Sequence, residues 1–394
     1  MRPHPDLEGV RADAGSRPAQ RVALITSSFA PHVGGVETHV AQVAERLQQR
    51  GHAVEVWAVD RGMRSSRRSP VPVRYLRTPL PARSLDGLYR ALWLVPRAWR
   101  QWRRAHREFR PDVLAVQCFG PNGVYAAALH RAFGTPLVVS SHGETMGDDN
   151  SAYRSRLLRR SLRRALGESA AVTAPSRYVL DDLRARFGLD DTAGSLVANG
   201  VDLTDGAHSA DAPRQRLALA VGRLGQMKGF DLLIDAFAAA GLDDVRLEII
   251  GDGPEREALQ QHIDAAGLGE HVRLVGEKRP GAVAQRIGAA AVVVVPSRSE
   301  SFGIVALEAW RGGAALIMTS RGGGAEFVQD GQDGLLVDPV DREALAAALR
   351  TVFSDEPRRL ALAQAGSERV DAFTWDDVTD AYEALFAQVV EKTR

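Results

Sequence analysis

Short apolar segments alternate with helical patterns along almost the whole chain, and this alternation restricts the fold more than any other feature. Residues 21–28 form a predicted buried strand, a helical pattern follows up to Arg50, and residues 53–59 form the next strand. Further predicted strands occupy residues 112–117, 137–140, 170–174, 217–221, 247–250, 272–275, 292–295, 315–318 and 334–337. Strands that alternate with helices predict an α/β protein whose parallel sheets are covered on both faces.

At 394 residues the chain is long enough for two domains, each with its own core. The predicted division is a disordered tail over residues 1–20, an N-terminal domain over 21–200, a linker over 201–213 and a C-terminal domain over 214–375. The last helix, residues 376–394, is compatible with either domain, and packing on the N-terminal one is retained as an option. Both domains are predicted to be Rossmann-like, doubly wound units, whose ligands bind beyond the carboxyl ends of the strands. The expected site is therefore a central cleft that both domains face.

The net charge of +1 hides an asymmetry between the two halves of the chain. Residues 1–200 hold 30 arginines against 18 acidic residues, whereas residues 201–394 hold 20 basic residues against 31 acidic ones. Such a division predicts two domains with different partners.

The chain has a single cysteine, Cys118, which excludes an intramolecular disulfide and a cysteine-rich metal site. The pairs Asp148-Asp149 and Asp376-Asp377 lack the converging partners that Mg²⁺ needs, so no metal site is predicted. No run approaches the roughly 18 to 20 apolar residues that span a bilayer, and the start of the chain lacks the apolar core of a signal peptide. We therefore expect a cytoplasmic protein.

The most informative segment for function runs from the predicted strand 292–295 to Glu308. Glu300 follows the strand, Gly303 makes a turn, and a helix then carries Glu308. The free N–H groups at the start of that helix favour an anion, whereas the two carboxylates favour neutral hydroxyl groups of a sugar or a ribose. The combination suits a sugar nucleotide. A glycosidase carboxylate pair is disfavoured, because Glu308 lies about 7 Å along the helix axis from the Gly303 turn.

Three further groups lie where a ligand of such sheets is expected. Gly34 and Gly35 follow the first strand and would let the backbone approach a phosphate, although a plain turn explains them equally well. Arg223 and Lys228 stand in a loop just past a strand and could bind phosphate oxygens, with solvated loop cations as the alternative. His142 ends the strand 137–140, where its imidazole could contact a sugar hydroxyl or simply pack.

Taken together, these motifs resemble the retaining glycosyltransferases of the GT-B fold, in the large group (glycosyltransferase family 4, group 1 type) that includes bacterial mannosyltransferases and sucrose synthases. The markers appear in order over nearly all of residues 21–390: Gly34-Gly-Val-Glu37, His142, Ala198-Asn-Gly-Val-Asp202, Gly222-Arg223 with Lys228, Ile250-Gly-Asp-Gly-Pro254, Glu300 with Glu308, Gly323-Gly-Ala-Glu326 and Asp330-Gly-Gln-Asp-Gly-Leu-Leu-Val337. The resemblance implies two Rossmann-like domains that face a central cleft.

The resemblance also implies a nucleotide-diphosphate sugar, bound mainly by the C-terminal domain, and transfer with retention of configuration without a metal or another cofactor. Arg223 and Lys228 would then hold the diphosphate, Glu300 the hydroxyls of the transferred sugar, and His142 would lie near the reacting carbon. The residues implied in donor binding are Gly34, Gly35, Gly276, Ser301, Phe302, Gly303, Ile304 and Glu308, the last at the ribose and Gly276 near the base. Ser301 replaces the commoner glycine, a form that some mannosyltransferases share.

The acceptor is expected at the N-terminal domain, as a hydroxyl group of a glycan, a lipid-linked molecule or a small molecule. Residues 88–110 hold seven arginines interspersed with tryptophans, and residues 153–166 add six more arginines. A basic helix that carries aromatic residues can lie on an anionic membrane surface, so peripheral contact with the inner face of the membrane is predicted. The alternative is an ordinary helix that covers the sheet with solvated arginines.

A second function class stays open at this point, namely a GT-B enzyme that is not a transferase, such as a sugar-nucleotide epimerase. The basic half would also suit a nucleic-acid partner, but the acidic second half and the sugar-nucleotide markers argue against one.

Overall fold

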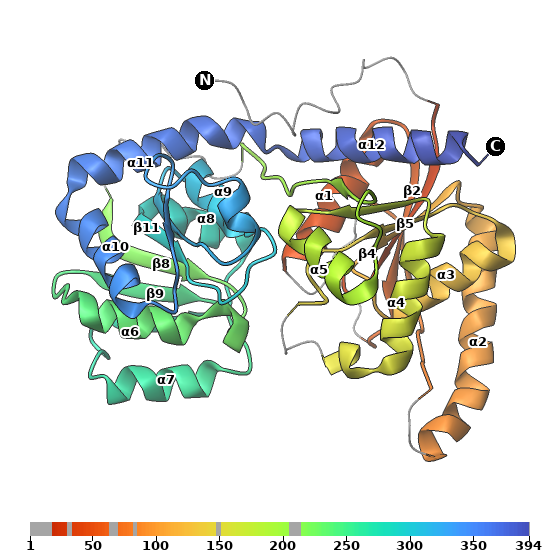
Figure 1. Ribbon diagram of the computed structural model, residues 1–394, viewed down its shortest axis with the longest axis horizontal. Coiled ribbons are helices and arrows are strands. Elements are labelled where there is room, and N and C mark those ends of the chain that lie inside the picture. Colours follow the sequence, from red (N-terminus) through yellow and green to blue (C-terminus); the bar gives the residue numbers. More distant parts are fainter. Residues whose placement is uncertain are drawn as a thin grey trace.

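The computed structural model describes residues 18–29, 34–62, 70–81, 85–146, 151–204 and 214–393. Most of the predicted tail over residues 1–20 and most of the predicted linker over 201–213 lie outside the described residues, as does Asp148-Asp149. The described chain forms two parallel sheets side by side, each enclosed by helices (Figure 1). The predicted α/β class with two parallel sheets is confirmed.

The first sheet has seven strands in the order β3-β2-β1-β4-β5-β6-β7, all parallel. Its strands are β1 (Arg21–Thr26), β2 (Ala53–Val59), β3 (Val73–Leu76), β4 (Val113–Gln117), β5 (Leu137–Ser140), β6 (Ala171–Ala174) and β7 (Ser195–Leu196). The central strands β1, β4 and β5 are almost completely buried, as their unbroken apolar runs predict. The two edge strands β3 and β7 are short and less buried, and the sequence pattern does not reveal them.

Helices cover both faces of this sheet. One face carries α2 (Leu85–Phe109), α3 (Pro121–Phe133), α4 (Arg156–Glu168) and α5 (Arg177–Phe187), and the other carries α1 (Gly35–Gln49) and α12 (Trp375–Glu391). The arginine-rich pattern of the sequence predicts one helix over about residues 151–166, and this prediction is wrong at its start. A 3₁₀ turn ends at Arg154, and the Ser155 hydroxyl then caps α4 by accepting from the Leu158 N–H.

The carboxyl-terminal helix α12 returns to the first sheet. It crosses from the second domain and lies along α1 (Figure 1). Arg50 forms ion pairs with Asp380 and Glu383, which hold α12 against the first domain. His52 also contacts the Glu383 carboxylate, at 2.9 Å. Since Val201 N–H donates to the Phe373 carbonyl at 2.9 Å, the two chain segments that join the domains are hydrogen-bonded to each other.

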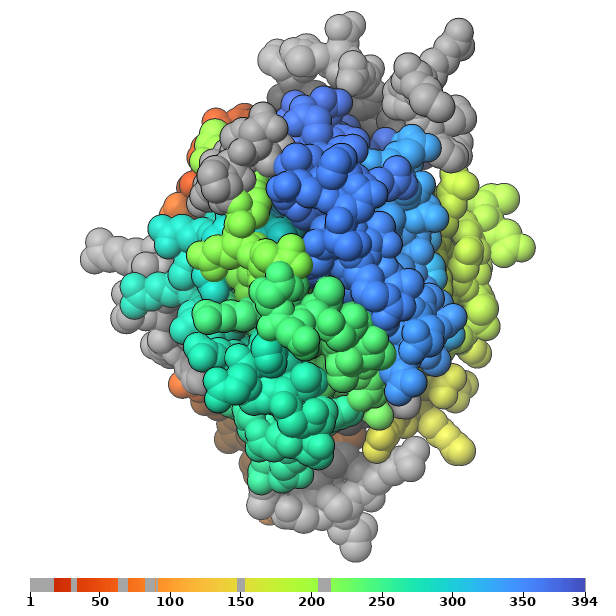
Figure 2. Space-filling view, turned by 90° about the vertical axis from the view of Figure 1, so that its left-hand side faces the viewer, coloured from red at the N-terminus to blue at the C-terminus, as the bar shows by residue number. Residues whose placement is uncertain are grey.

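The second sheet has six parallel strands in the order β10-β9-β8-β11-β12-β13. They are β8 (Gln215–Val221), β9 (Arg246–Ile250), β10 (Val272–Gly276), β11 (Ala290–Val295), β12 (Ala315–Thr319) and β13 (Leu335–Val337). Its helices are α6 (Phe230–Ala240), α7 (Arg256–Ala265), α8 (Pro280–Ala289), α9 (Ile304–Arg311), α10 (Arg342–Ser354) and α11 (Glu356–Arg369). Viewed from outside, α6 and α10 lie side by side over one face (Figure 2).

In each sheet the strand order reverses beside the first strand of the domain, between β1 and β4 and between β8 and β11. Loops that leave neighbouring strands at such a point diverge and leave room for a ligand. All the predicted site residues except Glu308, which lies further along a helix, fall in or beside loops that follow strands β1, β5, β8, β10 and β11.

Candidate active site

The carboxylate of Glu300 is buried and held by two partners. Lys228 Nζ donates to its Oε2 at 2.7 Å, and Ser297 Oγ donates to the same atom at 2.7 Å. Burial alone would raise the pKa of Glu300, but the charge and hydrogen bond of Lys228 outweigh it, so the pKa lies below the ordinary value. The structure thus joins the predicted sugar-binding carboxylate to one of the predicted diphosphate-binding cations, and the carboxylate is ionised.

Glycines allow the loops around this pair to touch. Gly229 has φ +65°, and a Cβ atom there would overlap the carbonyl oxygen of Pro296. The loop that carries Lys228 therefore lies directly on the loop that leads to Glu300. Arg223, at the start of the same loop, is exposed, and in the described part of the chain no hydrogen bond or ion pair engages its guanidinium. This cation is therefore available to a ligand.

The start of α9 has the backbone geometry that an anion requires. Gly303 lies in the left-handed region at φ +92°, and a Cβ atom there would stand 2.7 Å from Met318 Cε. The Ala306 N–H donates to the Gly303 carbonyl at 2.9 Å, whereas the N–H groups of Ile304 and Val305 at the start of α9 precede any acceptor that the helix itself could offer. Phe302 is buried and stacks on Phe327 with ring centroids 4.6 Å apart, so only its backbone is available to a ligand.

His142 follows β5 and is held from several sides. Its Nε2 lies 2.8 Å from Gln117 Oε1, its backbone N–H donates to Glu144 Oε2 at 2.7 Å, and its ring meets the edge of the His39 ring. Burial first, and then repulsion by His39, hold the pKa of His142 well below its ordinary value. The imidazole is therefore neutral at physiological pH. Because Gln117 Oε1 is an acceptor, the proton resides on Nε2 and Nδ1 is left as an acceptor.

A buried polar network around His142 was not anticipated from the sequence. His39 Nδ1 lies 2.8 Å from Asn199 Oδ1, and His39 Nε2 lies 3.2 Å from the Tyr382 hydroxyl. Gln117 also donates to the Ser140 hydroxyl at 3.2 Å. The available signals were weak: a glutamine in an otherwise apolar strand, and a histidine two residues after the Gly34–Glu37 motif.

Contacts between the two domains bring the predicted residues together. Gly35 faces Ile304, whose Cδ1 would lie 3.5 Å from a Cβ atom on the glycine. Gly143 faces Ser301, since a Cβ atom on Gly143 would lie 2.6 Å from Ser301 Cβ. Ser176 Oγ donates to the carbonyl of the same serine at 2.6 Å. The loop that follows Glu300 is thus enclosed from the N-terminal domain.

Three predicted donor residues are not shown to join these contacts. Gly34 precedes α1 in extended backbone, and a Cβ atom on it would meet the Glu37 carboxylate at 2.6 Å. Gly276 ends β10 at φ +74° and accepts a hydrogen bond from the Gly251 N–H at 3.1 Å. Glu308 is partly exposed on α9.

A hollow of about 500 Å³ opens at the seam between the domains. It is lined by Arg177, Tyr178 and Asp181 of α5 and by Arg298, Ser320, Arg321, Gly322 and Glu326 of the second domain. None of the predicted donor residues lines this hollow. Two of its arginines form ion pairs within the protein, Arg298 with Asp231 and Arg321 with Asp338.

Within the described ranges, no three histidine, cysteine, aspartate or glutamate side chains converge as a metal site would require. No described helix combines the length and the hydrophobicity that are needed to cross a bilayer.

Two parallel-sheet domains whose strand-end loops meet around a carboxylate, a lysine and a helix start define the GT-B class of protein. The family model described as "Glycosyltransferase Family 4" matches residues 33–205, and the one described as "Glycosyl transferases group 1" matches residues 207–369. The chain belongs to this glycosyltransferase family, and the predicted family and GT-B fold are confirmed.

Individual relatives extend over nearly the whole chain. A D-inositol 3-phosphate glycosyltransferase of Geodermatophilus obscurus is 30% identical over 95% of this chain and 90% of that protein. A phosphatidyl-myo-inositol mannosyltransferase of Mycolicibacterium smegmatis is 29% identical over 88% of each chain. Among solved structures, a sucrose-phosphate synthase from Thermosynechococcus elongatus shares the fold with a TM-score of 0.80 at 23% identity, over 95% of this chain and 100% of that one.

Proposed function

We propose that this glycosyltransferase moves a hexosyl group from a UDP- or GDP-sugar to a hydroxyl group, with retention of configuration and without a divalent metal. The observation that carries the proposal is the ionised Glu300 carboxylate, held by Lys228 at 2.7 Å beside the start of α9. A carboxylate there orients sugar hydroxyls, while the lysine charge and the helix N–H groups attract the departing diphosphate. Sugar and phosphate are thus recognised within one short loop.

The difficult step is the departure of a nucleoside diphosphate from a carbon that gains positive charge. Fixed donors aimed at the leaving phosphate lower that barrier most. Arg223 supplies a planar guanidinium from the loop after β8, and its side chain is not engaged by the described protein. The Lys228 ammonium is shared between Glu300 and the phosphate in this proposal. The leaving group is therefore neutralised by side chains and backbone, without a metal.

His142 contributes as a neutral hydrogen-bond acceptor. Since Gln117 engages Nε2, the unprotonated Nδ1 is the atom left to accept a hydrogen bond from a hydroxyl group of the transferred sugar. A cation at this position would repel the positive charge that develops at the reacting carbon. The lowered pKa of His142 keeps the imidazole neutral and so prevents that repulsion. His142 thus orients the sugar rather than protonating it.

For the acceptor, we infer a hydroxyl group of an inositol-type or lipid-linked molecule. Two similar relatives carry D-inositol 3-phosphate and phosphatidyl-myo-inositol in their names. Both align with most of this chain, including the N-terminal domain, where the acceptor is expected.

Donor binding and transfer are tested in two steps. Thermal shift against UDP-, GDP- and ADP-sugars identifies the donor, because a ligand at 100 times its dissociation constant adds about 2.7 kcal/mol to the free energy of unfolding. Liquid chromatography coupled to mass spectrometry then follows the donor with and without inositol phosphate or phosphatidylinositol, in the presence of a chelator. The chromatographic step is needed because an epimer of the donor has the same mass and differs only in retention time. Acceptor-dependent transfer is expected, and conversion of the donor alone would indicate an epimerase instead.

Arg223→Ala provides the sharpest test of the proposed leaving-group site. The exposed side chain contributes little to folding, so the melting temperature should stay the same while turnover falls roughly 10²- to 10³-fold. Arg273→Ala, which removes an exposed arginine from β10 of the same domain, is the matched control and should leave turnover unchanged. Near-normal turnover of Arg223→Ala would refute the assignment.

A further inference from the structure

An exposed apolar cluster stands out on the surface of the N-terminal domain. Among the described residues, six large hydrophobic side chains are exposed, and four of them lie within a single stretch of six residues. These four are Tyr89 (63% exposed), Leu92 (71%), Trp93 (56%) and Leu94 (42%), all in the first half of α2. They form what is called here the α2 tip. A concentration of large apolar side chains in water marks a binding surface more often than chance exposure.

Apart from Leu94, the side chains of the α2 tip lie on the same side of the helix as a row of arginines. Residues three or four positions apart lie on one helical face. By this spacing Tyr89, Leu92, Trp93 and Pro96 share a face with Arg100, Arg103, Arg104 and Arg107, and this face is called the outer stripe. The opposite face carries Ala98, Trp102, Ala105 and Phe109, which are buried in the core. The core thus fixes the direction in which the outer stripe points.

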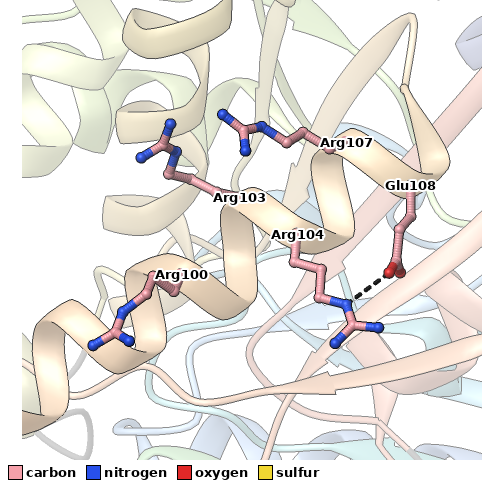
Figure 3. Close-up of a pocket in the computed structure, with 5 residues that line it drawn as sticks. All are labelled: Arg100, Arg103, Arg104, Arg107 and Glu108. Atoms are coloured by element: carbon pink, nitrogen blue, oxygen red, sulfur yellow. Dashed lines mark hydrogen bonds and ion pairs between the residues drawn. The ribbon is translucent and has the colours of Figure 1, made fainter.

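The position of α2 leaves the outer stripe accessible. The helix lies at the outer edge of the N-terminal domain, and its first turns protrude beyond the sheet (Figure 1). Further along, the side chains of Arg100, Arg103, Arg104, Arg107 and Glu108 surround a shallow hollow of about 250 Å³ (Figure 3). This hollow is lined by four cations and a single carboxylate.

The positive charge of the outer stripe is poorly compensated within the protein. Glu108 pairs with Arg104 at 2.7 Å but also with Arg74 at 2.6 Å. In the described part of the chain, no carboxylate forms an ion pair with Arg100 or Arg107. Helix α4, on the same face of the sheet, exposes further arginines. The surface therefore retains a net positive charge that suits an anionic partner.

We propose that the outer stripe of α2 docks on an anionic lipid bilayer. The α2 tip would enter the boundary between headgroups and acyl chains, and the arginines would meet lipid phosphates. A second copy of the chain fits less well, because two such stripes brought together repel each other. A nucleic acid would leave the apolar tip in water. Docking agrees with the proposed lipid-linked acceptor but does not depend on it, because the surface is described independently of the donor site.

Vesicle flotation of the full chain tests the proposal. The protein should float with vesicles of phosphatidylcholine and phosphatidylglycerol at low salt, should float much less at high salt, and should stay behind with phosphatidylcholine alone. The double variant Leu92→Ser/Trp93→Ser should weaken binding about tenfold or more. Arg100→Ala/Arg107→Ala should do the same and also reduce the salt dependence.

Matched variants on the other domain control for general effects of charge and hydrophobicity. Val340→Ser removes an exposed apolar side chain there, and Arg273→Ala/Arg342→Ala removes two exposed arginines. These variants should bind vesicles like the unchanged protein. Melting temperatures of all variants should stay close together, because every substituted side chain is exposed.

Three results would overturn the docking proposal. The first is no binding of the unchanged protein to anionic vesicles at low salt, and the second is normal binding by both α2 variants. The third is that the unchanged protein is a dimer and the α2 tip variant a monomer. The thermal shift with nucleotide sugars reads out the donor site separately. The α2 variants should retain that shift. A protein that binds vesicles but shows no thermal shift with any nucleotide sugar would refute only the proposed function.

Discussion

The rings of His39 and His142 meet edge to face, with centroids 4.6 Å apart and planes inclined by 70°. His39 comes from α1 and His142 from the loop after β5. Gln117 hydrogen-bonds to His142, Tyr382 hydrogen-bonds to His39, and the Tyr382 hydroxyl donates to Gln117 Oε1 at 3.4 Å. Tyr382 lies on α12, and Asn199, the second partner of His39, lies just before the segment that leads to the other domain. The predicted catalytic histidine is therefore held by distant parts of the chain.

Acid should destabilise the protein through this histidine pair. Burial lowers the pKa of His39 from 6.5 to about 4, although the hydrogen bond with Asn199 opposes the shift. Between these two values the unfolded chain binds more protons than the folded one, so the free energy of unfolding falls as the pH is lowered through that window. The loss from His39 alone is on the order of 3 kcal/mol, and His142, whose pKa is also lowered, adds to it with the same sign. Denaturant unfolding across the window measures the slope.

The variant His39→Asn should flatten this pH dependence, whatever its effect on absolute stability. His271→Asn, which replaces a partly exposed histidine of the second domain, is the control and should keep the slope of the unchanged protein. An unaltered slope in His39→Asn would show that the acid sensitivity comes from elsewhere.

Gln117 should act as a positioning residue for His142. Gln117→Leu removes the acceptor that holds Nε2, so the ring can rotate or change tautomer. Transfer should slow by roughly 10- to 100-fold, while the thermal shift with the donor is retained. Gln117→Glu keeps an acceptor but adds a negative charge, which raises the pKa of His142 and should move the acid limb of the pH–rate profile upward. A purely structural role would leave that limb in place.

Much of the fold follows from local sequence pattern. The run of valines at 292–295 predicts a strand in the centre of a sheet, and β11 is buried along its whole length. Strands β3 and β7 were not predicted, because each includes a charged or polar residue and forms no apolar run, whereas the equally short edge strand β13 is apolar throughout. Helix α8 was not predicted either, because the glycines at 281 and 288 and the small number of polar residues obscure its helical periodicity.

The sequence predicted individual residues of the candidate site but not the contacts between them. Glu300 and Lys228 each stand after a strand, which is a local signal. Their pairing joins residues 72 positions apart and depends on the close approach of two loops at Gly229, which no local pattern encodes. The network of His39 and Gln117 is equally non-local, because its polar side chains sit singly among apolar neighbours.

The Gly143–Ser301 contact should control how closely the domains meet. In Gly143→Ala a Cβ atom would stand 2.6 Å from Ser301 Cβ, at a residue with φ +89°. Gly134→Ala is a matched control, because Gly134 has φ +73° and nothing lies within 4 Å of its Cβ position. Both variants should lose about 1 to 2 kcal/mol of stability from backbone strain, but only Gly143→Ala should also lose transfer activity. Gly143→Ala/Ser301→Gly should recover part of that activity, and equal activity in the two alanine variants would contradict the contact.

Removal of Lys228 should affect stability as well as activity, unlike removal of Arg223. Lys228→Ala leaves the buried Glu300 carboxylate without its cation, which should cost about 1 to 2 kcal/mol, a value reduced because the lysine is 37% exposed. Since the loss of the cation raises the pKa of Glu300, the cost should be larger at neutral pH than at pH values where the carboxylate is protonated. Lys228→Ala/Glu300→Gln should regain part of the stability in urea unfolding. A double variant no more stable than Lys228→Ala would contradict the pairing.

Glu326 should hold the two domains together. Its carboxylate accepts hydrogen bonds from the backbone N–H groups of Arg177 and Tyr178, both at 2.8 Å, and so covers the start of α5 from the opposite domain. Glu326→Ala should open the domains, which small-angle scattering would detect as a larger radius of gyration, and should slow transfer. Asp341→Ala removes a helix cap within the second domain, where Asp341 Oδ1 accepts from the Ala344 N–H at 3.0 Å. That control should lower stability by about 1 kcal/mol without a change in scattering, so equal scattering of the two variants would mean that Glu326 does not restrain the domains.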